Sequence, residues 1–436
     1  MRTIRILLIL LAAIGSAPAF PEKDLNALYE HALKKSDSVK TARLNYERCR
    51  LLARRAVSDL LPSLSLGSGL SQSWSSESDY APSSENGSFS ADISFNLKLL
   101  DGFSNIYALK NARLELESAE IALRESMQSI FTATAECYLD ILYNAETIKY
   151  FEEQKAVLET RKKEAEKLIE LGLGIASDML TVDIDLLGND RELMAAGNAY
   201  SKSVLLMTKL TGLNEDSLKG LRDEVTLEEI GKIAGLPQEL DYDTLWNNAL
   251  EKRPDIAKKN IDLTMSRNSV KTSSAIFFPT ISAGGGYSVS GENFTADRRG
   301  FSARVSLDIP IISNAWKNIL NIMINKNGLE SKRVELNALL DDAAYEIRAC
   351  LMNYEESLKG LEISTATLEK SRITLSISKE KYSLGGIKLL DLQQVELNYK
   401  NSMNTLLKDK YQLMKNILLL SAAAGYLMDI GGIDEK

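Results

Sequence analysis

Four segments of the chain alternate between apolar and polar residues, which is the pattern of a β-strand with two different faces. From 89 to 99 every odd position is apolar and every even position is Ser, Asp, Asn or Lys; segments 64–74, 281–289 and 301–309 alternate similarly. A run of about 10 residues is long enough for a tilted strand to cross an outer membrane. An ordinary half-buried sheet shows the same pattern, so the alternation alone leaves both environments open.

Two long tracts, 105–170 and 315–383, have the spacing of long helices. Neither contains a proline, and at 1.5 Å per residue each would extend roughly 100 Å. In the first tract the apolar positions fall near heptad spacing, which predicts coiled-coil-like packing along narrow seams. The seam residues are Met127, Ile130, Thr134, Cys137, Ile141, Ile148, Phe151, Leu158, Ala165 and Ile169.

The chain also repeats itself. Segment 28–35 is echoed by 245–252 at an offset of 217, and an offset of 213 later maps Cys137 onto Cys350 and Gly212 onto Gly425. Landmarks this far apart that keep nearly one offset indicate a tandem duplication. We expect a first repeat over 20–212, a connector over 213–240, a second repeat over 241–425 and a C-terminal tail over 426–436. Each repeat is predicted to contain one helix (24–61 or 241–278), two strands, a long helix, a glycine break and a last helix.

The N-terminus has the features of a secretory signal peptide over residues 1–19. Arg2 and Arg5 precede an apolar core at 6–14, and Ala17-Pro18-Ala19 forms a cleavage site. The alternative, a membrane anchor, is disfavoured because the apolar run is too short to span a bilayer. The first cysteine is Cys49, so a lipid-modified N-terminus is not expected. The sequence therefore predicts an exported protein.

Composition argues against several kinds of chemistry. A net charge of −8 disfavours a nucleic-acid partner, and a single histidine, His31, leaves little scope for His-based metal sites or triads. The three cysteines form no CxxC pair, and there is no P-loop or Gly-x-Ser-x-Gly motif. Carboxylates on charged helices are usually a solvated face. We therefore expect no enzyme activity, cofactor or metal, and we expect the cysteines to be packing residues.

Four strands per chain cannot close a membrane barrel. Open sheet edges are not tolerated in lipid, and the smallest membrane barrels need about 8 strands, so a membrane-spanning protein of this kind must oligomerise. Three copies would provide twelve strands around a polar lumen. The alternative is an exported coiled-coil adhesin or periplasmic scaffold without channel activity. The alternation, kept in both repeats, disfavours it.

The order of these elements closely resembles that of TolC-type outer-membrane efflux proteins. The most specific markers are the segments 61–64, 279–281, 99–102 and 382–391, and the resemblance covers roughly 24–425. It implies a mainly α fold with a membrane β-barrel portion: a homotrimer with a twelve-stranded barrel in the outer membrane and an α-helical tunnel in the periplasm. The implied function is a passive exit duct of a tripartite efflux pump or type I secretion system. The implied partners are a periplasmic adaptor, an inner-membrane pump and outer-membrane lipid.

The glycine breaks at 171–178 and 384–391 are predicted to be helical hairpin tips. Gly172 and Gly174 do not suit a dinucleotide loop, since a charged helix precedes them and the third glycine position is Ser177. A glycine of positive φ would end one helix, and Ser177 or Asp178 would cap the next. In the second repeat, Gly385 and Gly386 break the chain at the equivalent place.

The resemblance also assigns gate residues at these tips. Ser177 and Asp178 match the family's hydroxyl–acid pair, and Tyr382 matches its gating tyrosine. The basic residue of that lock falls at Ile387, with Lys388 one position later as the substitute. Asp391 matches the upper of two constricting aspartates, and Gln394 replaces the lower. A single carboxylate ring should attract cations less strongly than two; helix capping is the competing role for Asp178 and Asp391.

Overall fold

The computed structural model describes residues 25–75, 84–171, 175–218, 225–237, 240–292, 295–309 and 315–429. The predicted signal peptide and the end of the tail lie outside these ranges. The chain forms two compact units, one from residues 1–40, 124–253 and 343–436 and the other from 41–123 and 254–342. Each unit therefore takes segments from both predicted repeats. Among the described residues, no helix has both the length and the apolar character needed to cross a membrane.

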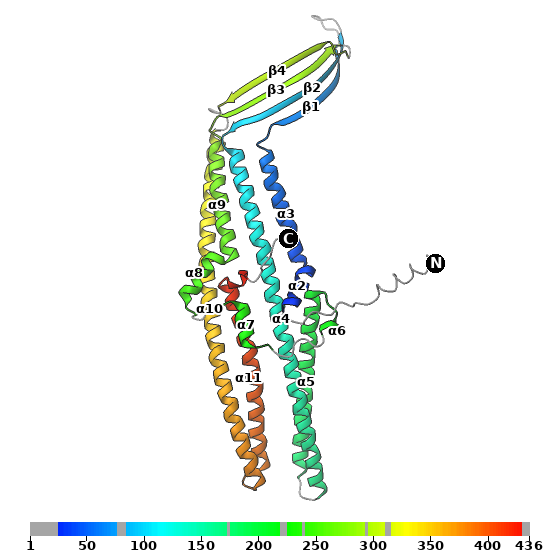
Figure 1. Ribbon diagram of the computed structural model, residues 1–436, viewed down its shortest axis with the longest axis vertical. Helices are drawn as coiled ribbons and strands as arrows, with labels where there is room; N and C mark the ends of the chain where they lie inside the picture. The colour runs from blue at the N-terminus through cyan, green and yellow to red at the C-terminus, as the bar shows by residue number, and fades with distance from the viewer. Residues whose placement is uncertain are drawn as a thin grey trace, which may run out of the picture. The chain divides into compact units, whose positions relative to one another are not determined.

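The second unit contains one antiparallel sheet of four strands. Its strands are β1 (Ser63–Ser75), β2 (Ser84–Asp101), β3 (Thr280–Glu292) and β4 (Arg298–Asp308), and they pair in the order β1-β2-β3-β4 (Figure 1). All four predicted strands are confirmed. The central pairing joins the two halves of the chain, with Phe95 opposite Gly285. Both outer strands, β1 and β4, leave an open edge in the single chain.

The pairing register separates the sheet into an apolar and a polar face. Leu66, Ile93, Tyr287 and Phe301 stand in one row across all four strands, whereas polar rows such as Ser65–Ser94 are linked by hydroxyl hydrogen bonds. Because side chains alternate along a strand, every row of one parity shares a face. The apolar face is open to its surroundings: Leu66 is 82% exposed and Phe301 is 77% exposed.

A row of three glycines, 284–286, runs through the middle of β3. A methyl group on Gly285 would lie 2.7 Å from the ring of Phe95 and 3.0 Å from the Ser302 carbonyl. The aromatic ring therefore occupies the place where a side chain of β3 would stand. This close approach is the physical reason for glycine at that position.

Four helical segments of the second unit adjoin the sheet. They are α3 (Asp37–Ser58), the start of α4 (Ser104–Glu170), α9 (Pro254–Ala275) and the start of α10 (Ala315–Ser383). Lys259 on α9 donates to Glu335 on α10 at 2.7 Å, and Asn268 donates to Asn111 on α4 at 2.8 Å. These contacts fasten α9 to its two long neighbours.

The other unit is helical throughout the part that the structure describes. It contains α2 (Leu25–Lys35), the rest of α4 and α10, α5 (Ala176–Thr211), α6 (Glu215–Leu218), α7 (Leu227–Ala234), α8 (Tyr242–Lys252), α11 (Leu389–Ala423) and the 3-10 turn η1 (Tyr426–Asp429). The predicted long helices are confirmed. So is the seam along α4, whose ten residues are all buried or half-buried. The cysteines are free, with Cys49 and Cys137 buried and Cys350 partly buried.

The prediction of one continuous helix at the start of each repeat was wrong. In the first repeat the helix is interrupted at Ser36, whose hydroxyl accepts the backbone N–H of Val39 at 3.3 Å and so begins α3. In the second repeat it is interrupted at Arg253, since Pro254 lacks the N–H that would continue the ladder and instead starts α9. The connector, for which no structure was predicted, contains α6 and α7. A Thr226–Glu229 capping box begins α7.

Candidate functional site

The second hairpin tip is a well-defined helix-ending turn. Gly385 has a φ of 73°, and its N–H donates to the Tyr382 carbonyl at 2.9 Å, while the N–H of Gly386 donates to the Lys381 carbonyl at 2.7 Å. This pair of bonds is the Schellman arrangement, in which a residue of positive φ satisfies the last carbonyls of a helix. The predicted role of Gly385 in ending the helix is confirmed, and Gly386 follows it without a positive φ.

After the turn, α11 is capped by its own carboxylate. Lys388 is the N-cap residue, and the Asp391 carboxylate accepts the Lys388 N–H at 3.3 Å. A carboxylate in the first helical turn also complements the helix dipole. The capping role for Asp391 is therefore confirmed, although Asp391 lies three residues inside the helix. Its side chain is nevertheless exposed, as is that of Gln394, which donates to Asn398 at 3.1 Å.

The first tip is described only in part. Gly172 and Gly174 lie outside the described residues, as does the side chain of Asp178. Of the two predicted caps of α5, Ser177 was wrong: Ile175 is the N-cap and makes no side-chain cap bond, while Ser177 already lies within the helix and its carbonyl accepts the Thr181 hydroxyl. The alternative cap, Asp178, stays a prediction. Tyr382, at the end of α10, is 40% exposed.

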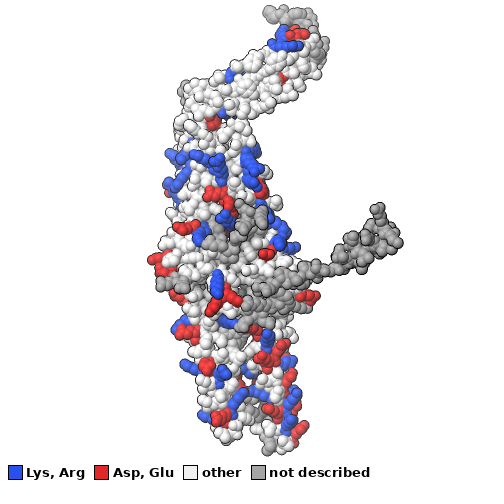
Figure 2. All heavy atoms as spheres, viewed as in Figure 1, with Lys and Arg blue, Asp and Glu red and all other residues white. Residues whose placement is uncertain are grey.

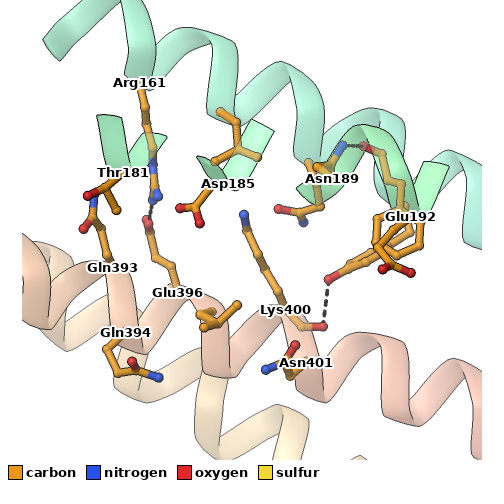
Figure 3. A pocket seen from close by; sticks show the side chains of 15 residues that line it. Arg161, Thr181, Asp185, Asn189, Glu192, Gln393, Gln394, Glu396, Lys400 and Asn401 are labelled. Carbon is orange, nitrogen blue, oxygen red and sulfur yellow. Dashed lines mark hydrogen bonds and ion pairs between the residues drawn. The ribbon is translucent and has the colours of Figure 1, made fainter. Parts of the chain in front are cut away.

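Beyond the predicted residues, the structure reveals an ionic cluster that ties α11 to the α4–α5 hairpin. Arg161 of α4 forms an ion pair with Glu396 of α11, with side chains only 20% and 12% exposed. Lys379 of α10 lies 3.9 Å from the other carboxylate oxygen of Glu396. Figure 3 shows Arg161 and Glu396 meeting between the helices. One carboxylate thus holds cations from two other helices.

The same cluster lines a cavity of about 310 Å³, shown in Figure 3. Lys400 and Asp185 face this space from α11 and α5, and the Tyr150 hydroxyl donates to the Lys400 carbonyl at 2.9 Å. Burial, followed by the nearby charge of Arg161, lowers the pKa of the Lys400 ammonium. Burial likewise lowers the pKa of Arg161 and raises that of Tyr150 to about 12. The cluster is therefore sheltered enough for its charges to interact strongly.

Sequence reasoning missed this cluster, but it had a signal. Arg161 lies three residues after the buried Leu158, and Glu396 lies four residues after the buried Leu392. Charged residues at these helical spacings share a face with the buried leucines. Opposite charges on two such seams indicate an interhelical pair.

For a metal ion, by contrast, the described residues offer no cluster of three or more His, Cys, Asp or Glu side chains.

A sheet with one open apolar face, joined to helices as long as α4 and α10, matches known proteins. The model of the outer membrane efflux protein family matches residues 28–213 and 245–426. The outer membrane protein TolC of Vibrio cholerae is 19% identical over 96% of this chain and 94% of its own length. The probable outer membrane lipoprotein SilC of Salmonella typhimurium is 22% identical over 93% and 86%. The solved structure of the outer membrane protein VceC from Vibrio cholerae superposes with a TM-score of 0.79, at 18% identity, over 93% of this chain and 97% of that one.

These matches extend over nearly the whole chain and define the class of protein. The chain belongs to the outer membrane efflux protein family. Its fold is that of the family's outer-membrane channels, mainly helical with four antiparallel strands per chain, and its location is the outer membrane. The alternative of a coiled-coil adhesin or scaffold finds no support among these relatives.

Proposed function

We propose that three copies of this chain form the exit duct of a tripartite efflux pump or type I secretion system. The observation that carries the proposal is the sheet: its apolar face is open, and both its edges are unpaired in the single chain. In lipid such edges must be paired, and three copies would pair β1 with β4 to close twelve strands. The polar face would then line an aqueous lumen.

The long helices would form the periplasmic part of the duct. The seam residues of α4 are buried or half-buried within the chain, whereas α10 exposes Tyr345 and Met352, at 77% and 68%. Exposed apolar residues along a long helix indicate neighbours along its length. We propose neighbouring copies around a tunnel, with a periplasmic adaptor and an inner-membrane pump at the hairpin tips. The two stretches matched by the family model support repeat boundaries near 20–212 and 241–425.

The gate is proposed at these tips. Ser177, Asp178, Tyr382 and Lys388 would hold the tunnel closed, and the turns at Gly172, Gly174, Gly385 and Gly386 would position them. Asp391 would provide one carboxylate per chain at the constriction, with Gln394 in the next ring. The exposure of the Asp391 side chain, despite its capping bond, supports this second role.

Planar-bilayer recording of the full chain tests the duct and the constriction together. We expect discrete conductance with a preference for cations, and Asp391→Asn should weaken that preference because it removes one charge per chain while keeping an acceptor for the Lys388 N–H. Glu369→Gln, which removes an exposed charge from α10, away from the second tip, is the matched control. Unchanged selectivity in Asp391→Asn would remove Asp391 from the constriction. A protein that stays monomeric and dissolved without detergent would refute the duct itself.

A further inference from the structure

A band of basic side chains surrounds the helix ends next to the sheet in the second unit. In the first repeat it comprises Arg50, Arg54 and Arg55 on α3, with Lys110 and Arg113 on α4, all of them exposed. Residues 50–58 and 104–113 contain no Asp or Glu. The band is therefore locally positive in a chain whose net charge is −8.

The second repeat contributes to the same band. Arg267 and Lys271 lie on α9, and Lys317 and Lys326 lie on α10, all exposed, and residues 267–275 and 315–326 again contain no Asp or Glu. Figure 2 shows Lys and Arg side chains gathered on the helices next to the sheet. We call the nine residues of the two repeats the basic girdle.

Several girdle positions are basic in both repeats. Arg267 and Lys271 correspond to Arg50 and Arg54 at the offset of 217, and Lys326 corresponds to Arg113 at the offset of 213. The two repeats differ at most other positions, so the recurrence of positive charge at these sites indicates a shared environment. The girdle is not explained by internal ion pairs: among the described residues, its one ion pair joins Arg50 to Glu47 at 3.3 Å.

Aromatic residues mark the depth of the girdle. The rings of Phe103 and Phe278 pack edge to face, with centroids 6.3 Å apart, where the strands give way to helices. Trp316, which corresponds to Phe103 at the offset of 213, is 73% exposed. Exposed aromatic rings at the end of an apolar surface are typical of the boundary between hydrocarbon and water. The girdle begins immediately beyond this boundary, on the helical side.

The distances suit a layer of phospholipid headgroups. Lys317 is two residues and Lys326 eleven residues from the start of α10, which corresponds to about 3 Å and 17 Å along the axis, and the other girdle residues lie between these limits. A headgroup layer is roughly 5–8 Å thick, and charges act over about 8 Å beyond it at physiological salt. Most of the girdle therefore lies within reach of the headgroups.

The carboxylates at the junction do not cancel this charge. They are Asp59, Asp101 and Asp308, with Glu47 and Glu115 eleven residues from the sheet-side ends of α3 and α4; these five are fewer than the nine basic residues of the girdle. Asp101 is in addition engaged, because its carboxylate accepts the backbone N–H of Asn105 at 3.0 Å and so caps α4.

We propose that the basic girdle binds the headgroups of anionic phospholipids in the leaflet that faces the helical part of the duct. The proposal rests on the proposed function, since it requires the sheet to span a membrane. Charge complementarity with the phosphodiester groups recruits these lipids, and the aromatic boundary places them beside the girdle. Anionic lipid thereby fixes the depth at which the duct sits.

Fluorescence quenching by brominated lipids tests the proposal at a defined depth. The full chain carries Trp74, Trp246 and Trp316. In a Trp74→Phe/Trp246→Phe background, Trp316 reports lipid beside the girdle; in a Trp246→Phe/Trp316→Phe background, Trp74 reports the opposite end of β1. Each protein is reconstituted in phosphatidylcholine vesicles containing either brominated phosphatidylglycerol or brominated phosphatidylcholine.

We expect phosphatidylglycerol to be preferred over phosphatidylcholine about fivefold at Trp316, because one basic residue near an anionic surface contributes about 1 kcal/mol. At Trp74 we expect no preference between the two lipids. The quadruple variant Arg267→Gln/Lys271→Gln/Lys317→Gln/Lys326→Gln removes the girdle residues of α9 and of α10, the helix that carries Trp316, and should abolish the preference at Trp316, as should high salt. The matched control Lys202→Gln/Lys209→Gln/Lys370→Gln/Lys408→Gln removes four exposed charges from the other unit and should keep it.

The outcomes separate this proposal from the duct itself. Quenching of both tryptophans without a preference at Trp316, or a preference that survives in the girdle variant, overturns the girdle proposal and leaves the duct intact. An equal loss in the matched control overturns it as well, since bulk charge would then explain the effect. If neither brominated lipid quenches Trp74 or Trp316, the sheet does not enter the bilayer, and both the girdle proposal and the duct proposal are overturned.

Discussion

Removing the Glu396 carboxylate should loosen the attachment of α11 to the α4–α5 hairpin. Glu396→Gln keeps the size of the side chain but leaves Arg161 and Lys400, both sheltered, facing each other with Asp185 as the nearby acid. Loss of one partner from a fully buried ion pair costs about 3–5 kcal/mol, and loss from an exposed pair costs about 0–1 kcal/mol. Because the two side chains are 20% and 12% exposed, we expect a cost of about 2 kcal/mol, between these limits.

Hydrogen exchange of backbone amides measures this cost locally. A loss of about 2 kcal/mol from the opening free energy speeds exchange about thirtyfold wherever opening breaks the Arg161–Glu396 contact. The faster exchange should be confined to α11 near Glu396 and to the facing turns of α4 and α5. Amides near Tyr411, whose hydroxyl donates to Glu146 at 2.6 Å farther along α11, should keep their rates.

A double replacement provides the decisive comparison. Arg161→Leu/Glu396→Leu removes both charges and leaves neither one buried alone. The amide exchange rates of this double variant should therefore be closer to those of the unaltered chain than the rates of Glu396→Gln are. Two results would refute the reasoning. One is an exchange rate in Glu396→Gln within twofold of the original, and the other is a double variant that exchanges faster than the single one.

Three further predictions concern other parts of the chain. Gly385→Ala should destabilise the second tip by about 1 kcal/mol, because a φ of 73° strains any Cβ and no atom within 4 Å would add a clash. Limited proteolysis at this tip should become faster, whereas Gly188→Ala, within α5 of the first hairpin and equally unobstructed, should leave the cleavage rate at the second tip unchanged. Glu335, whose pKa is lowered to about 2 by hydrogen bonds from Lys259 and Lys332, should stabilise the α9–α10 contact above pH 4.5 and lose this effect as the pH falls towards 2. In acid unfolding, Glu335→Gln should lose less stability over that interval than the unaltered chain does. Identical acid profiles of the two proteins would contradict the assignment. Cys137, whose pKa is raised to about 12 by burial, should resist maleimide at pH 7 in the folded protein and react after denaturation. Rapid labelling of Cys137 itself in the folded chain would show that α4 opens there.

The strands and long helices were predictable because their signals are local and repeated. Alternation at 89–99 and the apolar seam of α4 each follow from a period that neighbouring residues set. The breaks at Ser36 and Arg253 were missed because a single hydroxyl or a single missing N–H outweighs a favourable average composition. Among the tip residues, the role of Gly385 in ending α10 was predicted from the need for a residue of positive φ at that place. The Arg161–Glu396 pair was missed because the spacing from Leu158 and Leu392 places each charge on a buried helix face, but no local pattern specifies that these two faces meet.

The glycines at 284–286 bear on how the sheet can bend. Glycine offers the least resistance to the local coiling that a closing barrel requires, and the ring of Phe95 over Gly285 fills the space on the apolar face that such a bend would otherwise leave empty. β3 lies in the interior of the sheet, where both its neighbours are already paired within one chain. Each copy can therefore supply its share of the barrel's curvature before it meets another copy, so that assembly joins edges already turned towards each other.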